Sequence, residues 1–170
     1  MTHPMVKNLK SMFKPIAVKQ QDERRIMLNV PKDSLMSVLI FLKNSGYAHL
    51  GLISCVDRIA DNKFELVYIV SAYVEEDVDD SMKATFVVST FVSRKDPRFI
   101  TCIPVFINAE PYERELHELY GIVFEGHPRL TPLLLEREYP IPPMRKDFDS
   151  RAYVEEVFDT VPFVDQEDDS

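Results

Sequence analysis

HLGLISCVDRIADNKFELVYIVSAYVEEDVDDSMKATFVVSTFVS, residues 49–93, is the stretch that decides the fold class. It contains three runs rich in Val, Ile, Phe, Tyr and Thr, which are the residues that favour β-strands. Polar turn residues separate the runs, as expected between neighbouring strands of a sheet. The stretch therefore predicts three consecutive strands. The runs are 49–56, 64–74 and 84–93.

The break between the second and third runs is unusually acidic. Glu75–Asp80 reads EEDVDD and carries five acids in six positions. Repulsion among these charges favours a solvated hairpin loop. A metal cage is the alternative, but the segment lacks the spaced ligands and the turn glycine of a calcium loop. We therefore expect a solvent-exposed connection.

A short strand and a helix are predicted before this stretch. The strand is 25–30, closed by Pro31. Asp33 or Ser34 can cap a helix whose apolar residues follow the i, i+3, i+4, i+7 spacing, and Gly46 lies just past its end. Residues 1–25 show no clean period and are predicted as a loose or partner-ordered leader. The apolar helix positions are Leu35, Val38, Leu39 and Leu42.

Downstream, the pattern predicts a turn, an extended segment and a second helix. The turn is 95–97, the extended segment is 99–107, and the helix spans Ala109–Tyr120 with Gly121 at its end. Its apolar stripe faces the core, while Glu110 and Arg114 form an i, i+4 pair on the other side. The stripe consists of Ala109, Tyr112, Leu116, Leu119 and Tyr120.

The segment after this helix is rich in proline. Five prolines fall within the sixteen residues 128–143, and such a segment cannot continue a helix or a central strand. We expect the chain to be organised as a leader (1–25), a core domain (26–122) and an extended C-terminal arm with an acidic tail (123–170). The arm would take its order from another surface. Its prolines are Pro128, Pro132, Pro140, Pro142 and Pro143.

Composition limits the classes of protein. The 170 residues are 45% hydrophobic and 28% charged, with a net charge of −8, which suits one compact domain with an appendage and argues against nucleic-acid binding. The longest uncharged stretch, 44–56, is shorter than the about 20 apolar residues of a membrane span. The lysine-containing N-terminus lacks the apolar run of a secretory signal, so we expect a cytosolic protein. The basic residues of 1–25 and the acids of 151–170 could be solvated tails or docking arms.

The sequence gives little support for a standard catalytic or cofactor-binding motif. Cys55 and Cys102 are 47 positions apart and lie in apolar runs, so they are predicted to be reduced core residues rather than a disulfide or cluster ligands. Gly121 and Gly126 have the spacing of a phosphate loop, but His127-Pro128 replaces the required Lys-Ser/Thr.

The second helix holds the remaining candidates for chemistry. A carboxylate at Glu113 could orient the imidazole of His117 for acid/base work. A solvated or subunit-facing ion-pair surface is the favoured interpretation of this group, which also includes Glu115 and Glu118. A metal site at His117 and His127 would lack close third and fourth ligands.

Three blocks in this region resemble the signature of the thirty-kilodalton subunit family of respiratory complex I. That family also includes the matching subunits of energy-converting membrane-bound hydrogenases and related ferredoxin- or coenzyme-linked complexes. Weaker resemblance reaches back through 55–57 and 64–68. The blocks are Glu113-Arg-Glu-Leu-His-Glu-Leu-Tyr-Gly-Ile122, then Phe124-Glu-Gly-His-Pro128 with Leu130, then Pro143-Met-Arg-Lys-Asp-Phe148.

Some positions depart from the family pattern. His117-Glu118 stands where a variable residue and Asp are usual, Pro111 replaces a common Trp, and Thr131-Pro132 replaces a basic pair. The last two departures and the short length suggest a distant branch. They favour a hydrogenase-type or archaeal-style complex over an NADH- or other donor:quinone oxidoreductase, which stays open as the alternative.

The resemblance implies an α/β (α+β) domain with a mixed or antiparallel sheet flanked by helices. It also implies a non-catalytic assembly subunit without a cofactor of its own, in the hydrophilic arm on the cytoplasmic side of the membrane. Its partners would be a large hydrogenase-like subunit, a small iron–sulfur subunit, a ferredoxin-like iron–sulfur subunit and, indirectly, membrane subunits. Iron–sulfur clusters, and nickel–iron in some complexes, would lie in those partners. A small acid/base enzyme and a free-standing binding module are the rival classes.

The motif residues are the candidates for contacts between subunits. Arginine suits bidentate carboxylate contacts, so some ion pairs should lock the arm to the helix and others should cross to a partner. Tyr112, Tyr120, Phe124 and Phe148 would supply apolar anchors. The candidate site residues are Glu113, Arg114, Glu115, Tyr120, Gly121, Phe124, Gly126, His127, Pro128, Arg145, Lys146, Asp147 and Phe148.

Overall fold

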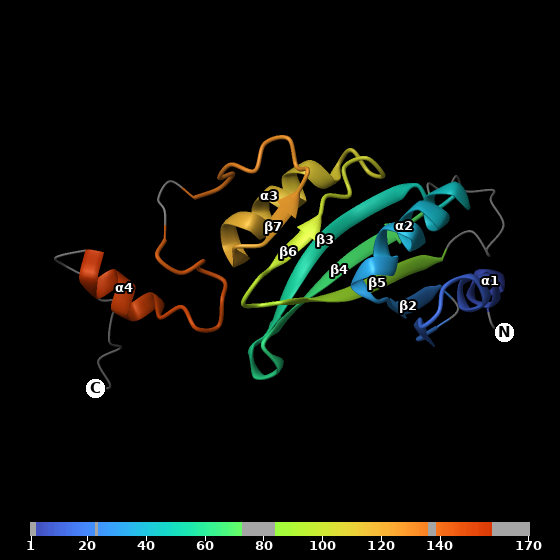
Figure 1. The fold of residues 1–170 in the computed structure, drawn as a ribbon, viewed down its shortest axis with the longest axis horizontal. Coiled ribbons are helices and arrows are strands. Elements are labelled where there is room, and N and C mark those ends of the chain that lie inside the picture. The colour runs from blue at the N-terminus through green and yellow to red at the C-terminus, as the bar shows by residue number, and fades with distance from the viewer. Residues whose placement is uncertain (1–2, 23, 73–83, 136–138, 158–170) are drawn as a thin grey trace, which may run out of the picture.

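The computed structural model describes residues 3–22, 24–72, 84–135 and 139–157 (Figure 1). The acidic stretch 75–80 and the residues from 158 onward lie outside these ranges, so the expectations for the hairpin loop and the acidic tail are not addressed. Within the described residues, no helix has the length and apolar character needed to cross a bilayer.

The centre of the molecule is a five-stranded mixed sheet. Its strands are β1 (Ala17–Gln20), β2 (Arg25–Asn29), β3 (His49–Arg58), β4 (Lys63–Ser71) and β5 (Thr85–Ser93). In space their order is β1-β2-β5-β4-β3 (Figure 1). β4 pairs antiparallel with both β3 and β5, whereas β2 pairs parallel with β5 and antiparallel with β1. The three strands predicted from 49–93 and the strand predicted from 25–30 are confirmed.

Only one face of this sheet is fully buried. In β4 buried and partly exposed residues alternate without a break from Phe64 to Ser71, which is the period of two expected for a strand with one covered face. β5 shows the same alternation from Thr85. The core is therefore built on one side of the sheet. Large strand residues in this core include Phe64, Tyr68, Phe86, Ile26 and Leu28.

Helices α1 (Pro4–Met12) and α2 (Leu35–Asn44) pack on that buried face. α2 follows a short 3-10 turn, η1 (Lys32–Ser34), and buries the four apolar residues that the sequence singled out. The residue after its last turn, Gly46, has a φ of +97°. α1 buries Val6 and Leu9, and the ring of His3 lies edge-on to Phe86 at 5.8 Å.

A second unit packs on the same buried face of the five-stranded sheet, against β3 and β4. β6 (Arg98–Ile100) and β7 (Val123–Glu125) pair in parallel, and α3 (Ala109–Tyr120) lies between them in the chain. α3 is fixed to β3 through two hydrogen bonds: Asn108 Nδ2 donates to the Leu50 carbonyl and the Tyr112 hydroxyl donates to the Gly51 carbonyl, both at 2.8 Å. Another short 3-10 turn, η2 (Ile59–Asp61), joins β3 to β4.

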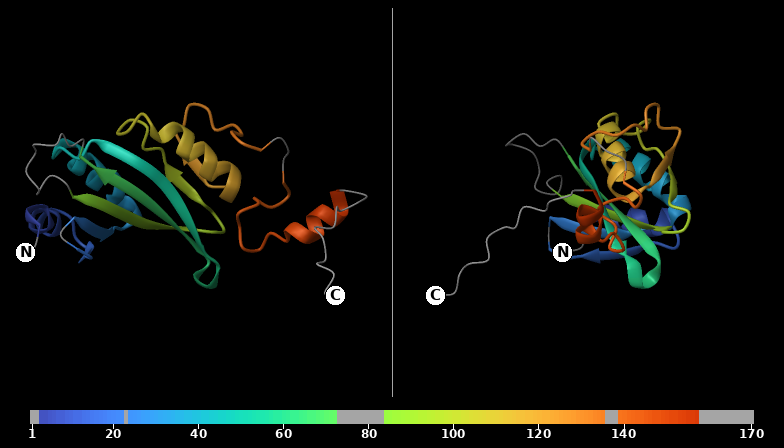
Figure 2. Two further views of the ribbon diagram at one scale, coloured as in Figure 1. Left: turned by 180° about the vertical axis from the view of Figure 1, so that it is seen from behind. Right: turned by 90° about the vertical axis from the view of Figure 1, so that its left-hand side faces the viewer.

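The chain then runs over α3 and leaves the sheet. We call residues 126–149 the arm; its described part, 126–135 and 139–149, contains no helix or strand. α4 (Ser150–Val157) follows at one end of the long axis, and α1 lies at the opposite end (Figures 1 and 2).

Three expectations from the sequence are wrong in detail. The leader is not loose, because α1 packs into the core and β1 extends the sheet. The extended segment 99–107 is a strand only to Ile100; the N–H groups of Val105 and Phe106 both donate to the Cys102 carbonyl and form a turn. The arm starts after Glu125, because 123–125 pairs with β6 as a strand.

Candidate functional site

The C-terminal end of α3 is shaped to receive the arm. Gly121 ends the helix with a φ of +73°, and its N–H donates to the His117 carbonyl at 2.8 Å. A Cβ at this position would lie 3.0 Å from both Arg145 Nη2 and Pro142 Cγ. Glycine is thus required for the left-handed turn and also for the close approach of the arm.

Glu113 is a fully buried carboxylate on the core side of α3. It accepts hydrogen bonds from the Thr101 hydroxyl at 2.5 Å and the Cys102 N–H at 2.7 Å. Burial raises the pKa of Glu113, although these donors oppose the shift. The side chain pins the loop after β6 to the helix. The expectation that Glu113 belongs to a solvated or subunit-facing surface is therefore wrong.

The two histidines near Glu113 bond to the main chain. His117 Nδ1 donates to the Ile122 carbonyl at 2.8 Å. His127 Nε2 donates to the Glu110 carbonyl at 3.2 Å, while its Nδ1 accepts the Arg129 N–H at 3.0 Å. Among the described residues, no three or more His, Cys, Asp or Glu side chains gather as a metal site would require. Both histidines therefore stabilise the main-chain conformation of the segments that follow α3.

Arg114 binds the arm through two main-chain carbonyls. Its Nε donates to Thr131 O at 3.0 Å, and its Nη2 donates to Pro132 O at 2.8 Å. The predicted pair with Glu110 is present, with 3.4 Å between Nη1 and Oε1. The side chain is only 11% exposed, so it is not the ordinary surface ion-pair residue that the sequence pattern suggests. Arg114 locks the arm to the helix, which is one of the two roles expected for such arginines.

Glu118, one turn further along α3, binds the next arm residues with the opposite polarity. Its carboxylate accepts the N–H groups of three consecutive residues at 3.2, 2.9 and 2.6 Å. Partial burial opposes ionisation, but these donors prevail and lower the pKa of Glu118. We call Arg114 and Glu118 the arm clamp. The donors are Leu133, Leu134 and Leu135.

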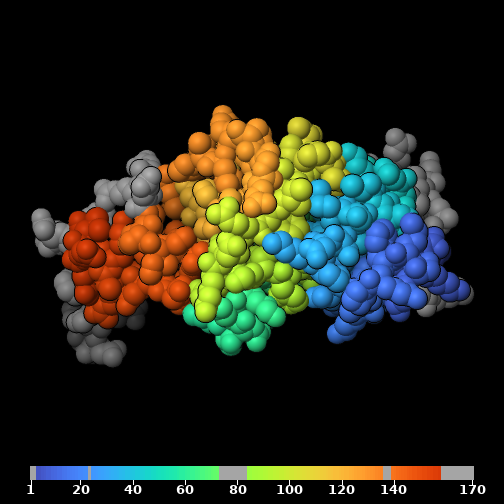
Figure 3. All heavy atoms as spheres, viewed as in Figure 1, coloured from blue at the N-terminus to red at the C-terminus, as the bar shows by residue number. Residues whose placement is uncertain are grey.

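The clamp fixes an apolar stretch that faces solvent. Leu134 is 61% exposed and Leu133 is 40% exposed, although their main chain is bonded to Glu118. In the space-filling view the arm forms the outer surface above α3 (Figure 3). Further along, Ile141 and Met144 are also exposed. Contiguous exposed apolar residues mark candidate protein–protein contacts, which makes this stretch a candidate for one.

The arm has a second attachment at the end of α3. Arg145 Nε donates to the Tyr120 carbonyl at 2.7 Å, and its guanidinium lies 5.2 Å from the centre of the Phe64 ring. The Met144 N–H donates to the Leu119 carbonyl at 3.0 Å. These contacts satisfy carbonyls that a helix end leaves without partners.

A buried ion-pair network completes this attachment. Asp57 on β3 is 4% exposed, lies 2.8 Å from Arg94 Nε, and accepts the Lys146 N–H at 2.9 Å. Arg94 Nη2 also lies 2.7 Å from Asp147 Oδ1. The third sequence block thus meets the 55–57 block in space. Of the three charged residues predicted here, Arg145 and Asp147 act through their side chains, whereas Lys146 acts through its main chain.

Of the predicted apolar anchors, one lies in the core and the other three are half-buried. Phe124 is buried, and Tyr120 lies edge-on to Phe64 at 5.9 Å. Phe148 lies edge-on to Tyr139 and tilted against Tyr153, at 5.8 and 5.6 Å between ring centres, and these contacts tie the arm to α4. Burial excludes Phe124 as an anchor for a partner, whereas the role expected for Tyr112, Tyr120 and Phe148 stays a prediction.

The other site residues have varied surroundings. Glu115 is half-buried, and Pro128 is exposed. Gly126 has a φ of +84°, with room for only a tight Cβ against Thr101. Sequence reasoning misses the importance of Arg94, and it places Glu118 on a solvated surface; Asp57 falls only within a weakly matching block.

Together these observations describe an α+β protein in which an irregular C-terminal arm is bound to the surface of helix α3. Residues 28–154 match the family described as the respiratory-chain NADH dehydrogenase, 30 Kd subunit. The chain belongs to this family, as the sequence resemblance predicted. It is therefore a thirty-kilodalton-type component of a complex I-like respiratory complex, and the other subunits of that complex are its partners.

Individual relatives support this assignment. The chain is 36% identical over 127 residues to the corresponding subunit of F420H2 dehydrogenase from Methanosarcina mazei, covering 74% of this chain and 76% of the relative. It is 31% identical over 136 residues to the corresponding subunit of NADH-quinone oxidoreductase from Neorickettsia sennetsu, covering 79% and 69%. A chain in the structure of the membrane-bound sulfane sulfur reductase, an archaeal respiratory membrane complex, superposes with a TM-score of 0.81 at 28% identity, covering 98% and 96%.

Proposed function

We propose that this chain is a non-catalytic assembly subunit that docks on the large subunit of its complex through the arm. The observation that carries the proposal is the arm clamp: Arg114 and Glu118 hold the main chain of 131–135 in order while Leu133 and Leu134 stay exposed. An ordered apolar loop loses less conformational entropy on binding than a flexible one. The arm is therefore suited to dock without rearrangement.

The rival interpretation as a small acid/base enzyme receives no support from the geometry. Glu113 is sealed from solvent, with both carboxylate oxygens bonded to the loop after β6. His117 holds a main-chain carbonyl. A general base must reach the proton that it abstracts from a substrate, and Glu113 has no such access.

Cofactors, partners and location complete the proposal. Redox groups would belong to neighbouring subunits: a large hydrogenase-like subunit, a small iron–sulfur subunit and a ferredoxin-like iron–sulfur subunit. The chain would lie on the cytoplasmic side of the membrane, in the hydrophilic part of the complex. The near-complete superposition on a chain of an archaeal respiratory membrane complex supports a hydrogenase-type or related complex. The match to part of an NADH-quinone oxidoreductase keeps the quinone-reducing alternative open.

Purification of the intact complex from its native host tests this proposal. The subunits that accompany the wild-type chain identify the complex and its electron acceptor. The double variant Arg114→Ala/Glu118→Gln should be lost from the complex while staying folded as a monomer. The control variant Arg98→Ala/Glu125→Gln changes the same residue types in an exposed ion pair outside the arm and should assemble normally. Assembly of the clamp variant at the wild-type yield would refute docking through the arm.

A further inference from the structure

The sheet face opposite α1, α2 and α3 is apolar, and no described helix covers it. A continuous row of four side chains crosses it from β2 to β3, since Met27, Val87, Ile69 and Leu52 are register partners. Four residues of this face are between 36% and 40% exposed. We call it the open face. Its apolar residues are Met27, Leu52, Val56, Val67, Ile69, Val87 and Phe91.

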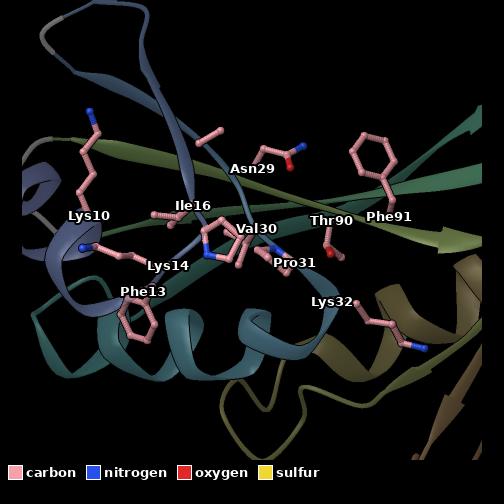
Figure 4. Close-up of a pocket in the computed structure, with 12 residues that line it drawn as sticks. Lys10, Phe13, Lys14, Ile16, Asn29, Val30, Pro31, Lys32, Thr90 and Phe91 are labelled. Carbon is pink, nitrogen blue, oxygen red and sulfur yellow. The ribbon is translucent and has the colours of Figure 1, made fainter.

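A pocket of about 820 Å³ adjoins the open face beside α1 (Figure 4). It exists because β2 ends at Asn29 and Pro31 follows, whereas β5 continues to Ser93. The edge of β5 beyond Ser89 therefore has no strand pairing from β2. Apolar side chains form most of the wall. They include Phe13, Ile16, Val30, Pro31 and Phe91.

One polar atom in this pocket lacks a partner. Thr90 is fully buried and lines the pocket, and its Oγ1 has no hydrogen-bond partner among the residues that the structure describes. Figure 4 draws this hydroxyl between Pro31 and Phe91. Buried hydroxyls in proteins normally have a partner. A polar group that enters the pocket would supply one.

The charges around the pocket and the open face are mainly positive. Lys10, Lys14 and Lys32 line the pocket, and no acidic residue of the described ranges does. On the open face the strands add Lys19, Arg25 and Lys63, while the acidic Glu65 is paired with Arg58 at 2.6 Å. This local excess of cations contrasts with the net charge of −8 for the whole chain. The surface is therefore complementary to an acidic partner.

We propose that the pocket and the adjoining open face bind an extended segment of another subunit that combines acidic with apolar side chains. The unpaired edge of β5 can bond to the main chain of such a segment, as in strand addition to a sheet edge. A second copy of the same face would meet like charges, and a lipid has no main chain to pair with this edge. The inference rests on the proposed function, because the segment belongs to a neighbouring subunit.

Photo-cross-linking within the purified native complex tests this. Phe91 is replaced by p-benzoylphenylalanine, and cross-linked peptides are mapped by mass spectrometry. The expected product joins position 91 to one peptide of another subunit that contains several carboxylates. The double variant Lys10→Glu/Lys14→Glu should lower the cross-link yield roughly tenfold through charge repulsion. Lys7→Glu, on the same helix as Lys10 but outside the pocket, is the control and should change the cross-link yield little.

The outcomes separate the two proposals. An intact complex that gives no cross-link, a lipid adduct, a cross-link to a second copy, or a peptide without acids would overturn this inference and leave docking through the arm untouched. Failure of the wild-type chain to co-purify with any other subunit would overturn both. Melting temperatures of the variants, measured on the isolated chain, show whether a lost cross-link reflects lost folding.

Discussion

Arg114 and Glu118 lie one helical turn apart on α3 and bind adjacent parts of the arm with opposite polarity. The guanidinium donates to the carbonyls of Thr131 and Pro132, and the carboxylate accepts N–H groups from residues 133–135. An i, i+4 pair of opposite charge normally stabilises a helix surface by a few tenths of a kcal/mol. Here both charges are directed at main chain instead. The pair converts an irregular segment into an ordered surface.

The first prediction concerns Arg114→Ala. The variant removes two charge-assisted hydrogen bonds, each worth about 1.5–3 kcal/mol, from the contact between the arm and α3. The core does not depend on this side chain, so the melting temperature of the isolated chain should fall by only a few degrees. The yield of assembled complex should fall severalfold. Arg98→Ala removes an arginine that is 55% exposed and lies outside the arm, and it serves as the control.

An Arg114→Ala chain that assembles as well as the control would contradict this prediction. A collapse of the monomer's melting temperature would instead make Arg114 a residue of the core.

The second prediction concerns Glu118 and pH. Its folded-state pKa is lowered from 4.5, so its stabilising effect is complete above that value and is lost as the pH falls through the lower, folded pKa. The protection of the N–H groups of 133–135 against hydrogen exchange, relative to an unstructured chain at the same pH, should therefore be high at neutral pH and lower in acid. Glu118→Gln should show fast exchange already at neutral pH. Unchanged protection in Glu118→Gln, compared with Glu115→Gln, would rule out the clamp.

The third prediction concerns Gly121→Ala. The new Cβ would be held at a φ of +73° and would lie 3.0 Å from Arg145 and Pro142. The left-handed conformation alone costs a non-glycine residue about 1–2 kcal/mol, and displacement of the arm adds to this cost. Unfolding in urea should show a loss of at least that size. Gly51→Ala, whose Cβ would meet its nearest neighbour at an ordinary 3.6 Å, should lose clearly less.

The fourth prediction concerns Asp57→Ala. Removing this carboxylate leaves Arg94, whose side chain is 10% exposed, without its buried partner, and such losses typically cost about 3–5 kcal/mol. Because Arg94 keeps its contact with Asp147, we expect the loss of stability to lie near the lower end of this range. Glu65→Ala breaks a pair whose arginine is 51% exposed and should cost about 0–1 kcal/mol. Equal losses in the two variants would exclude a special role for the Asp57 network.

The fifth prediction is that the isolated chain binds no stoichiometric metal. Both cysteines are buried, and burial raises the pKa of Cys55 to about 12, which disfavours the thiolate that a cluster requires. The histidine nitrogens are bonded to main-chain groups at His117 and His127. Elemental analysis of the purified monomer should find iron, nickel and zinc only in traces. One equivalent of any of them would refute the prediction.

The sequence predicts those parts of the fold that depend on local periodicity. The strands from 49–93 and the helices at 35–44 and 109–120 follow from alternation and from 3.6-residue spacing. It does not predict α1, because the burial of Val6 and Leu9 depends on the sheet assembled from distant strands. Nor does it predict the turn at 102–106, where apolar residues suggest a strand.

For the candidate site, the sequence singles out residues of α3 and the arm that the structure brings together, but it does not predict all of their surroundings. Its pattern places Glu113 at the surface because isolated carboxylates usually lie there; only the contact with Thr101 and Cys102 makes its burial tolerable. In the sequence Glu118 looks like a solvated acid. Its partners are main-chain N–H groups, and the pattern of side chains along a sequence does not reveal such partners. The Asp57–Arg94 contact joins residues 37 positions apart and has no local signal.

The parallel pairing of β2 with β5 has a consequence for how the chain folds. Arg25 pairs with Thr85, so the partner of β2 lies 60 positions further along the chain, whereas β3, β4 and β5 follow one another as neighbours. Loop closure over such a separation is slow compared with hairpin formation. During synthesis β2 therefore leaves the ribosome before β5 but pairs with it late, after β3, β4 and β5 have paired with one another. Until then this apolar strand remains exposed to aggregation, and chaperone binding should concentrate there.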